Sequence, residues 1–298
     1  MDASLDRAYA ELVPAAWLDA VVDRALDEDR GPGDLTSEAA IGPDVRARAR
    51  LRAKGAGRLA GLPVFRRVFE RCDPGCSVEL VASDGDAVLP GQELVRVEGA
   101  ARALLLAERT ALNFVQRLSG VATATDALVR LAEGRARILD TRKTTPGLRA
   151  LEKYAVRCGG GENHRFGLFD EAMVKENHID LAGGDAESVG RRVREAIGPA
   201  VRLTVEARDD AEARGAVRGG ADVVLLDNRT PEEIAALVPE LRALARELGR
   251  EVEFEASGGI HAGNLARYAA CGIDRISIGA VTHSVASLDL SLELEPLR

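Results

Sequence analysis

Cysteine is scarce in this chain of 298 residues. The four cysteines, Cys72, Cys76, Cys158 and Cys271, are too few and too scattered for a disulfide framework. Cys72 and Cys76 have no second ligand pair that would complete a zinc site. We therefore expect all four to be reduced thiols with structural roles.

The chain also lacks a long apolar run, a basic N-terminal start and an excess of positive charge. No stretch of about eighteen apolar residues is present, so the sequence predicts no membrane span. The first twenty residues include Asp2, Asp6, Glu11 and Asp19, unlike a secretory signal, which predicts a cytoplasmic protein. With 40 basic and 48 acidic residues, the net charge of −8 argues against nucleic acid or an anionic membrane as a partner.

Lysine is rare among the 40 basic residues: only Lys54, Lys143, Lys153 and Lys175 are lysines, and all the others are arginine. A compact ammonium group fits pockets that a broad guanidinium does not. Three of the four lysines lie between residues 143 and 175. This clustering indicates that the stretch needs lysine in particular.

Three segments of the N-terminal part have clear periodicity. Residues 5–27 have apolar side chains at helical spacing, and residues 101–133 are helical with a predicted break near Ser119 and Gly120. Residues 45–54 alternate between apolar and basic side chains, which predicts a half-buried strand. Its basic face, from Arg46 to Lys54, is either a surface for a polyanion or a solvated face paired with acidic neighbours, and the second arrangement is commoner.

From residue 137 onward, short apolar strands alternate with helices. The predicted strands are 137–141, 172–175, 202–206, 222–227, 253–257 and 275–279, and the predicted helices are 148–157, 185–197, 209–218, 231–248 and 262–271. Such units indicate parallel strands buried on both faces, in a barrel or a doubly wound sheet. Because a polar or glycine residue follows each strand, we favour a barrel, and six strands instead of eight make it incomplete.

In a barrel, the residues at the carboxyl ends of the strands meet on one rim, where barrel enzymes place their chemistry. The cationic candidates are Arg142, Lys143, His164, Arg165 and Lys175, and the acidic ones are Glu206 and Asp227. Charges in a partly closed mouth need opposite charges, and two carboxylates leave an excess of cations. This pattern predicts a polyanionic substrate, with internal ion pairs as the alternative.

Glycine runs after the last two strands predict a phosphate site. Ser257, Gly258 and Gly259 precede the helix predicted at 262–271, whose free N–H groups would face the ligand. Gly279 follows the next strand, and barrels frequently bind phosphate between their last two loops. The carboxylates Glu206 and Asp227 would hold either Mg²⁺ with substrate phosphate oxygens or the hydroxyls of a sugar, unless they only cap strand ends.

Five runs of residues resemble those of quinolinate phosphoribosyltransferases. They are Asp140-Thr-Arg-Lys-Thr-Thr-Pro-Gly-Leu-Arg149, Gly159-Gly-Gly-Glu-Asn-His-Arg-Phe-Gly-Leu-Phe-Asp170, Val174-Lys-Glu-Asn-His178, Leu225-Leu-Asp-Asn228 and Glu255-Ala-Ser-Gly-Gly259. The first two runs are long and highly specific. The resemblance extends from about residue 29 to the end of the chain.

The resemblance implies an α/β fold in two domains and one reaction. An N-terminal α/β sandwich would occupy residues 1–116, and an incomplete parallel α/β barrel of about six strands would occupy 117–284, with 285–298 packed back on the first domain. The protein would be a homodimer. As a decarboxylating pentosyltransferase, it would convert quinolinate and phosphoribosyl pyrophosphate, with magnesium, to nicotinate mononucleotide, pyrophosphate and carbon dioxide, in the biosynthesis of NAD.

The resemblance also implies a role for each candidate residue. Arg142, His164 and Arg165 would meet the quinolinate carboxylates, with Lys175 close by and Arg109 contributed by the partner subunit. Lys143 would lie where the two substrates meet, and either Lys143 or Lys175 would stabilise the carbanion-like centre of decarboxylation. The remaining members of the set are Glu206 and Asp227 for the ribose hydroxyls and magnesium, Ser257, Gly258, Gly259, Ile278, Gly279 and Ala280 for phosphate, and Thr141 and His283 as further binding residues.

Two other functions stay open at this point. A nicotinate phosphoribosyltransferase, or a family paralogue associated with molybdenum transport loci, would share the barrel and the phosphate site. Two substrate carboxylates need more cations than one, so Arg142 together with His164 and Arg165 favours quinolinate over nicotinate. A non-catalytic nucleotide sensor or polyanion binder using the strand at 45–54 would bind without turnover.

Overall fold

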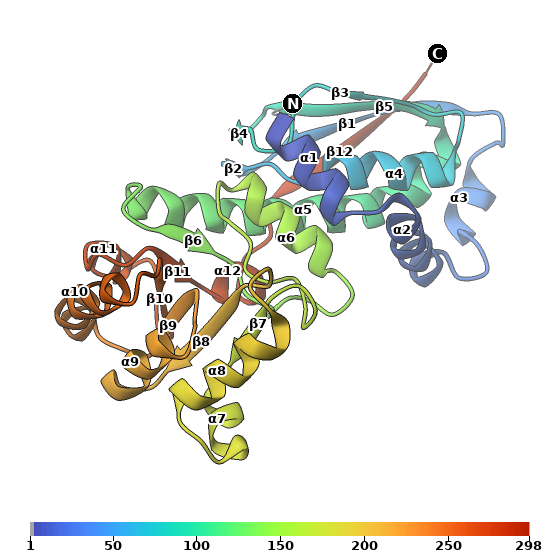
Figure 1. Ribbon diagram of the computed structural model, residues 1–298. Coiled ribbons are helices and arrows are strands. Elements are labelled where there is room, and N and C mark those ends of the chain that lie inside the picture. The colour runs from blue at the N-terminus through green and yellow to red at the C-terminus, as the bar shows by residue number, and fades with distance from the viewer. Residues whose placement is uncertain (1–2, 298) are drawn as a thin grey trace. The chain divides into compact units, whose positions relative to one another are not determined.

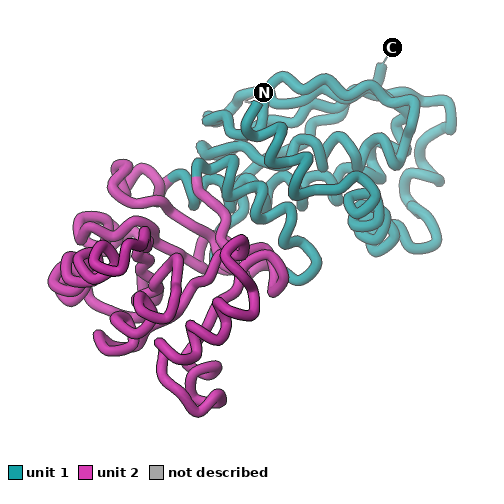
Figure 2. The backbone as a smooth tube through the Cα atoms, viewed as in Figure 1, with its two compact units in different colours: residues 1–126, 145–160, 284–298 teal, residues 127–144, 161–283 magenta. Residues whose placement is uncertain are grey.

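The computed structural model describes residues 3–297, which form two compact units (Figures 1 and 2). Unit 1 combines the described residues up to Asp126 with Thr145–Gly160 and with those from Ser284 onward. Unit 2 combines Ala127–Thr144 with Gly161–His283. The main sheet of unit 1 is antiparallel, whereas that of unit 2 is parallel with six strands. The predicted fold class is therefore confirmed.

The main sheet of unit 1 has the strand order β12-β1-β5-β3. Its strands are β1 (Arg46–Ala53), β3 (Ser77–Leu80), β5 (Glu93–Ala100) and β12 (Leu290–Pro296), and a second sheet pairs β2 (Gly57–Arg58) with β4 (Ala87–Val88). β12 runs antiparallel to β1, with Leu292 opposite Leu51. The sequence analysis did not predict this strand, although Leu290, Leu292 and Leu294 alternate with polar residues as a half-buried strand requires.

Strand β1, in which apolar and basic side chains alternate, is half-buried as the sequence predicts. Its alanines and Leu51 are buried, while the basic side chains alternate with them on the other face. Acidic residues of β5 and β12 pair with this face: Arg48 with Glu98 at 2.5 Å, Arg50 with Glu295 at 2.8 Å, Arg52 with Glu293 at 3.0 Å and Lys54 with Glu293 at 3.8 Å. These pairs favour a solvated, ion-paired face over a surface for a polyanion.

The helices of unit 1 lie on one side of its main sheet, as Figure 1 shows. They are α1 (Ala3–Leu12), α2 (Ala15–Arg30), α3 (Leu35–Ala40), α4 (Leu62–Cys72), α6 (Arg149–Cys158) and the longest, α5 (Ala101–Ala132), which continues into unit 2. The helical spacing of residues 5–27 belongs to two helices, because Pro14 in an extended conformation (ψ 135°) separates α1 from α2. None of the helices within residues 3–297 is long and apolar enough to cross a membrane.

Helix α5 continues through Ser119 and Gly120, where the sequence indicated a break. A β-carbon on residue 120 would lie 2.2 Å from the carbonyl oxygen of Ala286 and 3.1 Å from Cα of Ser287. The segment leading to β12 therefore crosses the helix in backbone contact. Glycine is required at position 120 by this close approach, and the prediction of a helix break was wrong.

Replacing Gly120 by alanine is expected to lower the free energy of unfolding by about 1–3 kcal/mol, the usual cost of overpacking. Helix propensity acts in the opposite direction, since alanine stabilises a helix interior by about 1 kcal/mol relative to glycine. Urea denaturation of the wild type and the variant measures the difference. A more stable variant would mean that propensity outweighs the contact with residues 286–287.

The parallel sheet of unit 2 has the strand order β6-β11-β10-β9-β8-β7. The strands are β6 (Arg137–Leu139), β7 (Ala172–Val174), β8 (Leu203–Ala207), β9 (Val223–Asp227), β10 (Glu253–Ser257) and β11 (Arg275–Ser277). All six predicted strands are confirmed, with ends that differ by at most two residues. Within the described part of the chain, β6 and β7 are the two edges and do not pair with each other, so the barrel is incomplete.

The helices of unit 2 are α7 (Glu176–Ala182), α8 (Ala186–Ile197), α9 (Asp210–Arg218), α10 (Pro231–Glu247), α11 (Leu265–Ala269) and α12 (Ala280–His283). The helix predicted at 262–271 is shorter than expected and does not begin directly after the glycine run. The Asn264 side chain accepts a hydrogen bond from the amide of His261 (2.8 Å) and donates one to the carbonyl of Gly259 (3.0 Å). This turn occupies the residues between the glycines and α11, so the helix begins later than predicted, and the orientation of its N–H groups toward a ligand stays a prediction.

Candidate active site

A cavity of about 650 Å³ opens where the strands of the parallel sheet end, and we call it the rim cavity. Every candidate of the sequence analysis except Arg109 lines it: Thr141, Arg142, Lys143, His164, Arg165, Lys175, Glu206, Asp227, Ser257, Gly258, Gly259, Ile278, Gly279, Ala280 and His283. Arg109 lines a separate cavity of about 260 Å³ in unit 1, with Glu28, Asp29 and Arg117. The barrel thus brings together residues that are up to 142 positions apart, from 141 to 283.

Lys175 and Glu206 form an ion pair inside the rim cavity. Lys175 follows β7 and is the N-cap residue of α7, and its Nζ lies 2.5 Å from Oε2 of Glu206 on β8. Glu176 lines the same cavity and was missed by the sequence analysis, although it stands beside Lys175 in a quoted motif. Three carboxylates therefore face the cations of the cavity, one more than the sequence analysis counted.

The pKa of Glu206 is raised from 4.5 to about 7, because the carboxyl is buried and lies next to Glu176, although Lys175 acts in the opposite direction. Since this pKa is above the ordinary value, proton uptake by Glu206 favours the folded protein. Its stabilising contribution is fully present below about pH 4.5 and is lost as the pH rises through about 7.

Glu206→Gln tests this titration, because the amide does not titrate. Between about pH 4.5 and about pH 7, we expect the free energy of unfolding to fall more steeply with pH in the wild type than in the variant. Urea denaturation at a series of pH values measures both slopes. Parallel pH dependences would show that Glu206 does not titrate in this range.

The loops after β9 and β10 touch each other at one side of the rim cavity. The amide of Asn228 donates to the carbonyl of Ser257 at 2.9 Å, and the Asn228 side chain donates to Asp227 at 2.6 Å. Gly258 has φ +92°, and a β-carbon there would lie 2.2 Å from Oδ1 and 3.0 Å from the backbone nitrogen of Asn228. Only glycine fits, so bare backbone lines this part of the cavity. Asn228 is a second lining residue that the sequence analysis quoted in a motif without giving it a role.

Lys143 reaches the rim cavity over the loop that follows β11. The Thr282 hydroxyl donates to the Lys143 carbonyl at 2.7 Å, which ties the two loops together. A β-carbon on residue 279 would lie 3.0 Å from Cδ of Lys143 and 3.1 Å from the His283 ring, so Gly279 leaves room for both side chains. The Lys143 side chain is therefore placed by packing, while its residue as a whole stays exposed.

His164 and Arg165 are held in place by buried polar groups. The Asp140 carboxylate accepts hydrogen bonds from the amide of His164 and from the Asn163 side chain, both at 2.8 Å. Arg165 is 8% exposed, and its Nη1 donates to the carbonyl of Glu171 at 3.3 Å. Burial, and then the positive charge of Arg142, lower the pKa of Arg165. Two guanidinium groups that repel each other in one cavity favour an anionic ligand between them.

The carboxylates of the rim cavity fit one kind of metal. Among residues 3–297, no group of three or more His, Cys, Asp or Glu side chains could hold a metal ion. Mg²⁺ keeps several waters and binds through one or two carboxylates together with substrate phosphate oxygens. Glu206 and Asp227 would suit such a site, and magnesium stays a prediction from the sequence.

The chain forms an incomplete parallel barrel, and its rim cavity is lined by basic side chains and glycines. These features are typical of enzymes that act on anionic small molecules. Two family models match the chain: the N-terminal domain of quinolinate phosphoribosyl transferase at residues 34–119, and its C-terminal domain at residues 121–293. The chain belongs to the quinolinate phosphoribosyltransferase family.

Individual relatives agree with the family models. A "probable nicotinate-nucleotide pyrophosphorylase [carboxylating]" of Bacillus subtilis is 42% identical over 268 residues, which cover 90% of each chain. The crystal structure of NadC from Streptococcus pyogenes has a TM-score of 0.88 at 38% identity and covers 94% of this chain and 97% of that chain. Human nicotinic acid phosphoribosyltransferase (TM-score 0.62, 18% identity, covering 93% of this chain and 73% of that one) shares the fold alone.

Proposed function

We propose that the rim cavity is the active site in which this quinolinate phosphoribosyltransferase brings its two substrates together. The enzyme converts quinolinate and phosphoribosyl pyrophosphate to nicotinate mononucleotide, pyrophosphate and carbon dioxide, a step in the biosynthesis of NAD. One observation carries the proposal: a single cavity holds two arginines and two lysines beside two glycine loops. This arrangement suits a dicarboxylate and a phosphorylated sugar at the same time.

Quinolinate would bind at the side of the cavity formed by Arg142 and Arg165, whose guanidinium groups match planar carboxylates. Lys175, whose Nζ lies 2.5 Å from Oε2 of Glu206, would be close to this side. His164 belongs to the same segment as Arg165. Nicotinate, with a single carboxylate, would leave one of these cations uncompensated in a partly buried site.

Phosphoribosyl pyrophosphate would bind at the loops that follow β8, β9, β10 and β11. Glu206 and Asp227 would accept hydrogen bonds from the ribose hydroxyls. The backbone at Gly258 and Gly279, free of side chains, would approach phosphate closely. Magnesium bound between these carboxylates and the substrate would neutralise negative charge on the pyrophosphate.

The charges of the cavity suit both chemical steps. As pyrophosphate leaves the anomeric carbon, the site must hold the quinolinate nitrogen in line and stabilise the departing negative charge, and Lys143 lies over the Gly279 loop where this charge would develop. The resulting pyridinium ring accepts the electron pair that the adjacent carboxylate leaves behind when carbon dioxide departs. Lys143 or Lys175 would stabilise the carbanion-like carbon until it is protonated.

A homodimer with shared active sites is part of the proposal. Arg109 lines a cavity of unit 1 with Thr110, Asn113 and Phe114. The resemblance to the family implies that Arg109 serves the rim cavity of the partner subunit. The cytoplasmic location stays a prediction from the sequence.

Incubation of the purified protein with phosphoribosyl pyrophosphate, magnesium and either quinolinate or nicotinate tests the function. We expect equal amounts of carbon dioxide and mononucleotide from quinolinate and no turnover of nicotinate. Turnover of nicotinate instead would overturn the assignment of two arginines to two carboxylates. Binding without turnover of either substrate would favour a non-catalytic sensor.

A further inference from the structure

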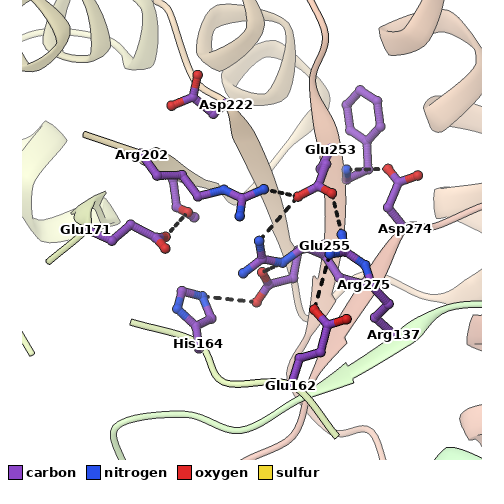
Figure 3. Close-up of polar contacts among 12 residues, drawn as sticks. Arg137, Glu162, His164, Glu171, Arg202, Asp222, Glu253, Glu255, Asp274 and Arg275 are labelled. Atoms are coloured by element: carbon purple, nitrogen blue, oxygen red, sulfur yellow. Dashed lines mark hydrogen bonds and ion pairs between the residues drawn. The ribbon is translucent and has the colours of Figure 1, made fainter. Parts of the chain in front are cut away.

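A network of charged side chains lies next to His164 in unit 2, along strands β10 and β11 (Figure 3). Glu255 on β10 is fully buried, and its Oε2 lies 2.8 Å from Nε of the buried Arg275 on β11. Its Oε1 faces Nε2 of His164 at 3.5 Å. Figure 3 shows Glu255 between His164 and Arg275. The sequence analysis treated the strand at 253–257 as apolar and gave Glu255 no role.

Glu255 is a carboxylate in this environment. Burial by itself raises its pKa, but His164, Arg275 and Ser277 together outweigh burial, so that the pKa of Glu255 lies below its ordinary value. A buried charge must be satisfied on all sides to be tolerated. Arg275 serves one oxygen of the carboxylate, and the ring of His164 is the group that faces the other.

The contacts of His164 define its tautomer. Nδ1 of the ring accepts a hydrogen bond from the backbone amide of Arg165 at 2.7 Å, so Nδ1 carries no proton. The proton of the neutral ring is therefore on Nε2, the nitrogen that faces Glu255. The distance of 3.5 Å is long for a hydrogen bond, so the contact between the ring and the carboxylate is electrostatic.

We propose that Glu255 is a positioning residue for quinolinate binding. Its carboxylate holds the Nε2–H tautomer of His164, and Nδ1 of His164 in turn fixes the backbone of Arg165, whose side chain lines the rim cavity. His164 then acts mainly by orienting Arg165, with both ring nitrogens directed at protein groups. This inference rests on the proposed function in one respect, because it takes quinolinate as the ligand of Arg165.

Glu253, at the other end of the same network of charged side chains, provides a matched control. Glu253 on β10 forms ion pairs with Arg137 and Arg202 and lies 3.4 Å from Arg275. It belongs to the same strand and the same network as Glu255, but the network places Arg275 and Glu255 between it and His164. Loss of its charge alters the network without changing the group that faces the histidine ring.

Glu255→Gln is the first test, with Glu253→Gln as the control. An amide carries no negative charge, so the ion pair with Arg275 and the attraction to Nε2–H of His164 are both lost in this variant. We expect the KM for quinolinate to rise about 10–100-fold, by analogy with the loss of an outer partner of a metal-binding histidine. The KM for phosphoribosyl pyrophosphate should stay within about twofold, and Glu253→Gln should leave both KM values within the same limit.

Long-range ¹H–¹⁵N NMR of histidine-labelled protein reads the tautomer directly. The chain has 4 histidines, so the His164 signals can be assigned by their loss in His164→Asn. We expect the Nε2–H form in all three proteins, because the Arg165 amide keeps Nδ1 unprotonated. The Nε2–H resonance should shift in Glu255→Gln and stay unchanged in Glu253→Gln, because only Glu255→Gln removes the negative charge that faces this proton. An unchanged Nε2–H resonance in Glu255→Gln, or an unchanged KM for quinolinate, would overturn the proposal. If a variant only contained less correctly folded enzyme, its apparent kcat would fall, but the KM for quinolinate and the NMR signals of folded His164 would not change.

Two substitutions of His164 keep the proposal testable if Glu255→Gln does not fold. Asparagine places its Oδ1 where Nδ1 of histidine lies and retains an acceptor for the Arg165 amide. Glutamine reaches toward Glu255 with its NH₂ group and has no acceptor at that position. We expect the KM for quinolinate to rise less in His164→Asn than in His164→Gln, whereas equal losses would indicate direct contact between the ring and substrate.

The proposed function and this inference fail in distinguishable ways. A wild-type protein that does not turn over quinolinate would contradict the function. The tautomer of His164 does not depend on turnover, so the NMR measurement decides the role of Glu255 in either case.

Discussion

Replacement of Lys143 by alanine is expected to lower kcat about 10²–10³-fold, the usual loss when one preorganised electrostatic group is removed from an active site. The ammonium group would stabilise the departing pyrophosphate and the carbanion-like carbon, both of which carry more negative charge in the transition state than in the bound substrates. KM for either substrate should change much less than kcat. Steady-state assays of carbon dioxide and mononucleotide measure both parameters.

Lys54→Ala is the matched control, because Lys54 lies on β1 in unit 1, where it pairs with Glu293 at 3.8 Å. It should retain wild-type kcat. Lys143→Arg separates charge from shape, since the Lys143 stem packs where a β-carbon on residue 279 would lie 3.0 Å from Cδ. We expect Lys143→Arg to stay well below wild type. Near-normal kcat in Lys143→Ala would remove this residue from the mechanism.

Mixing two inactive variants is expected to restore activity if the active sites are shared between subunits. Arg109→Ala and Lys143→Ala would each be nearly inactive alone. In a hybrid dimer, one of the two sites would have both wild-type residues, because Arg109 would come from one chain and Lys143 from the other. Random exchange of subunits gives hybrids in about half of the dimers, so the mixture should reach about one quarter of wild-type activity.

A mixture of Lys143→Ala with Lys175→Ala is the control for this experiment. Both lysines line the rim cavity of the same chain, so every site in the hybrid keeps one defect and no activity should return. Subunit exchange is monitored with fluorescent labels on the two chains. Exchange without recovery in the Arg109 mixture would contradict a shared site.

The sequence was sufficient to predict the parts of the fold that depend on local pattern. The alternation in β1 and the apolar strands β6 to β11 have the periodicity that their surroundings require. The gathering of Lys143, Lys175 and Glu206 also followed from the sequence, because parallel strands that close into a barrel bring their carboxyl ends together.

The features that sequence reasoning missed depend on distant parts of the chain. Gly120 resembles a helix break by itself, and only the approach of residues 286–287 explains it. Glu255 resembles a polar interruption of an apolar strand, and only Arg275 and His164 explain why a charge is tolerated there. Similarly, the Asn264 side chain shortens the helix after the glycine loop through its contacts with His261 and Gly259.

The pairing of β12 with β1 has a consequence for how the protein is made. The ribosome releases β12 (Leu290–Pro296) only after all of unit 2, so until then β1 (Arg46–Ala53) has no neighbour on one side. An unpaired strand edge is a template for aggregation, and basic side chains along it oppose pairing with an identical chain. The arginines of β1 therefore protect the nascent protein before they pair with the glutamates of β12.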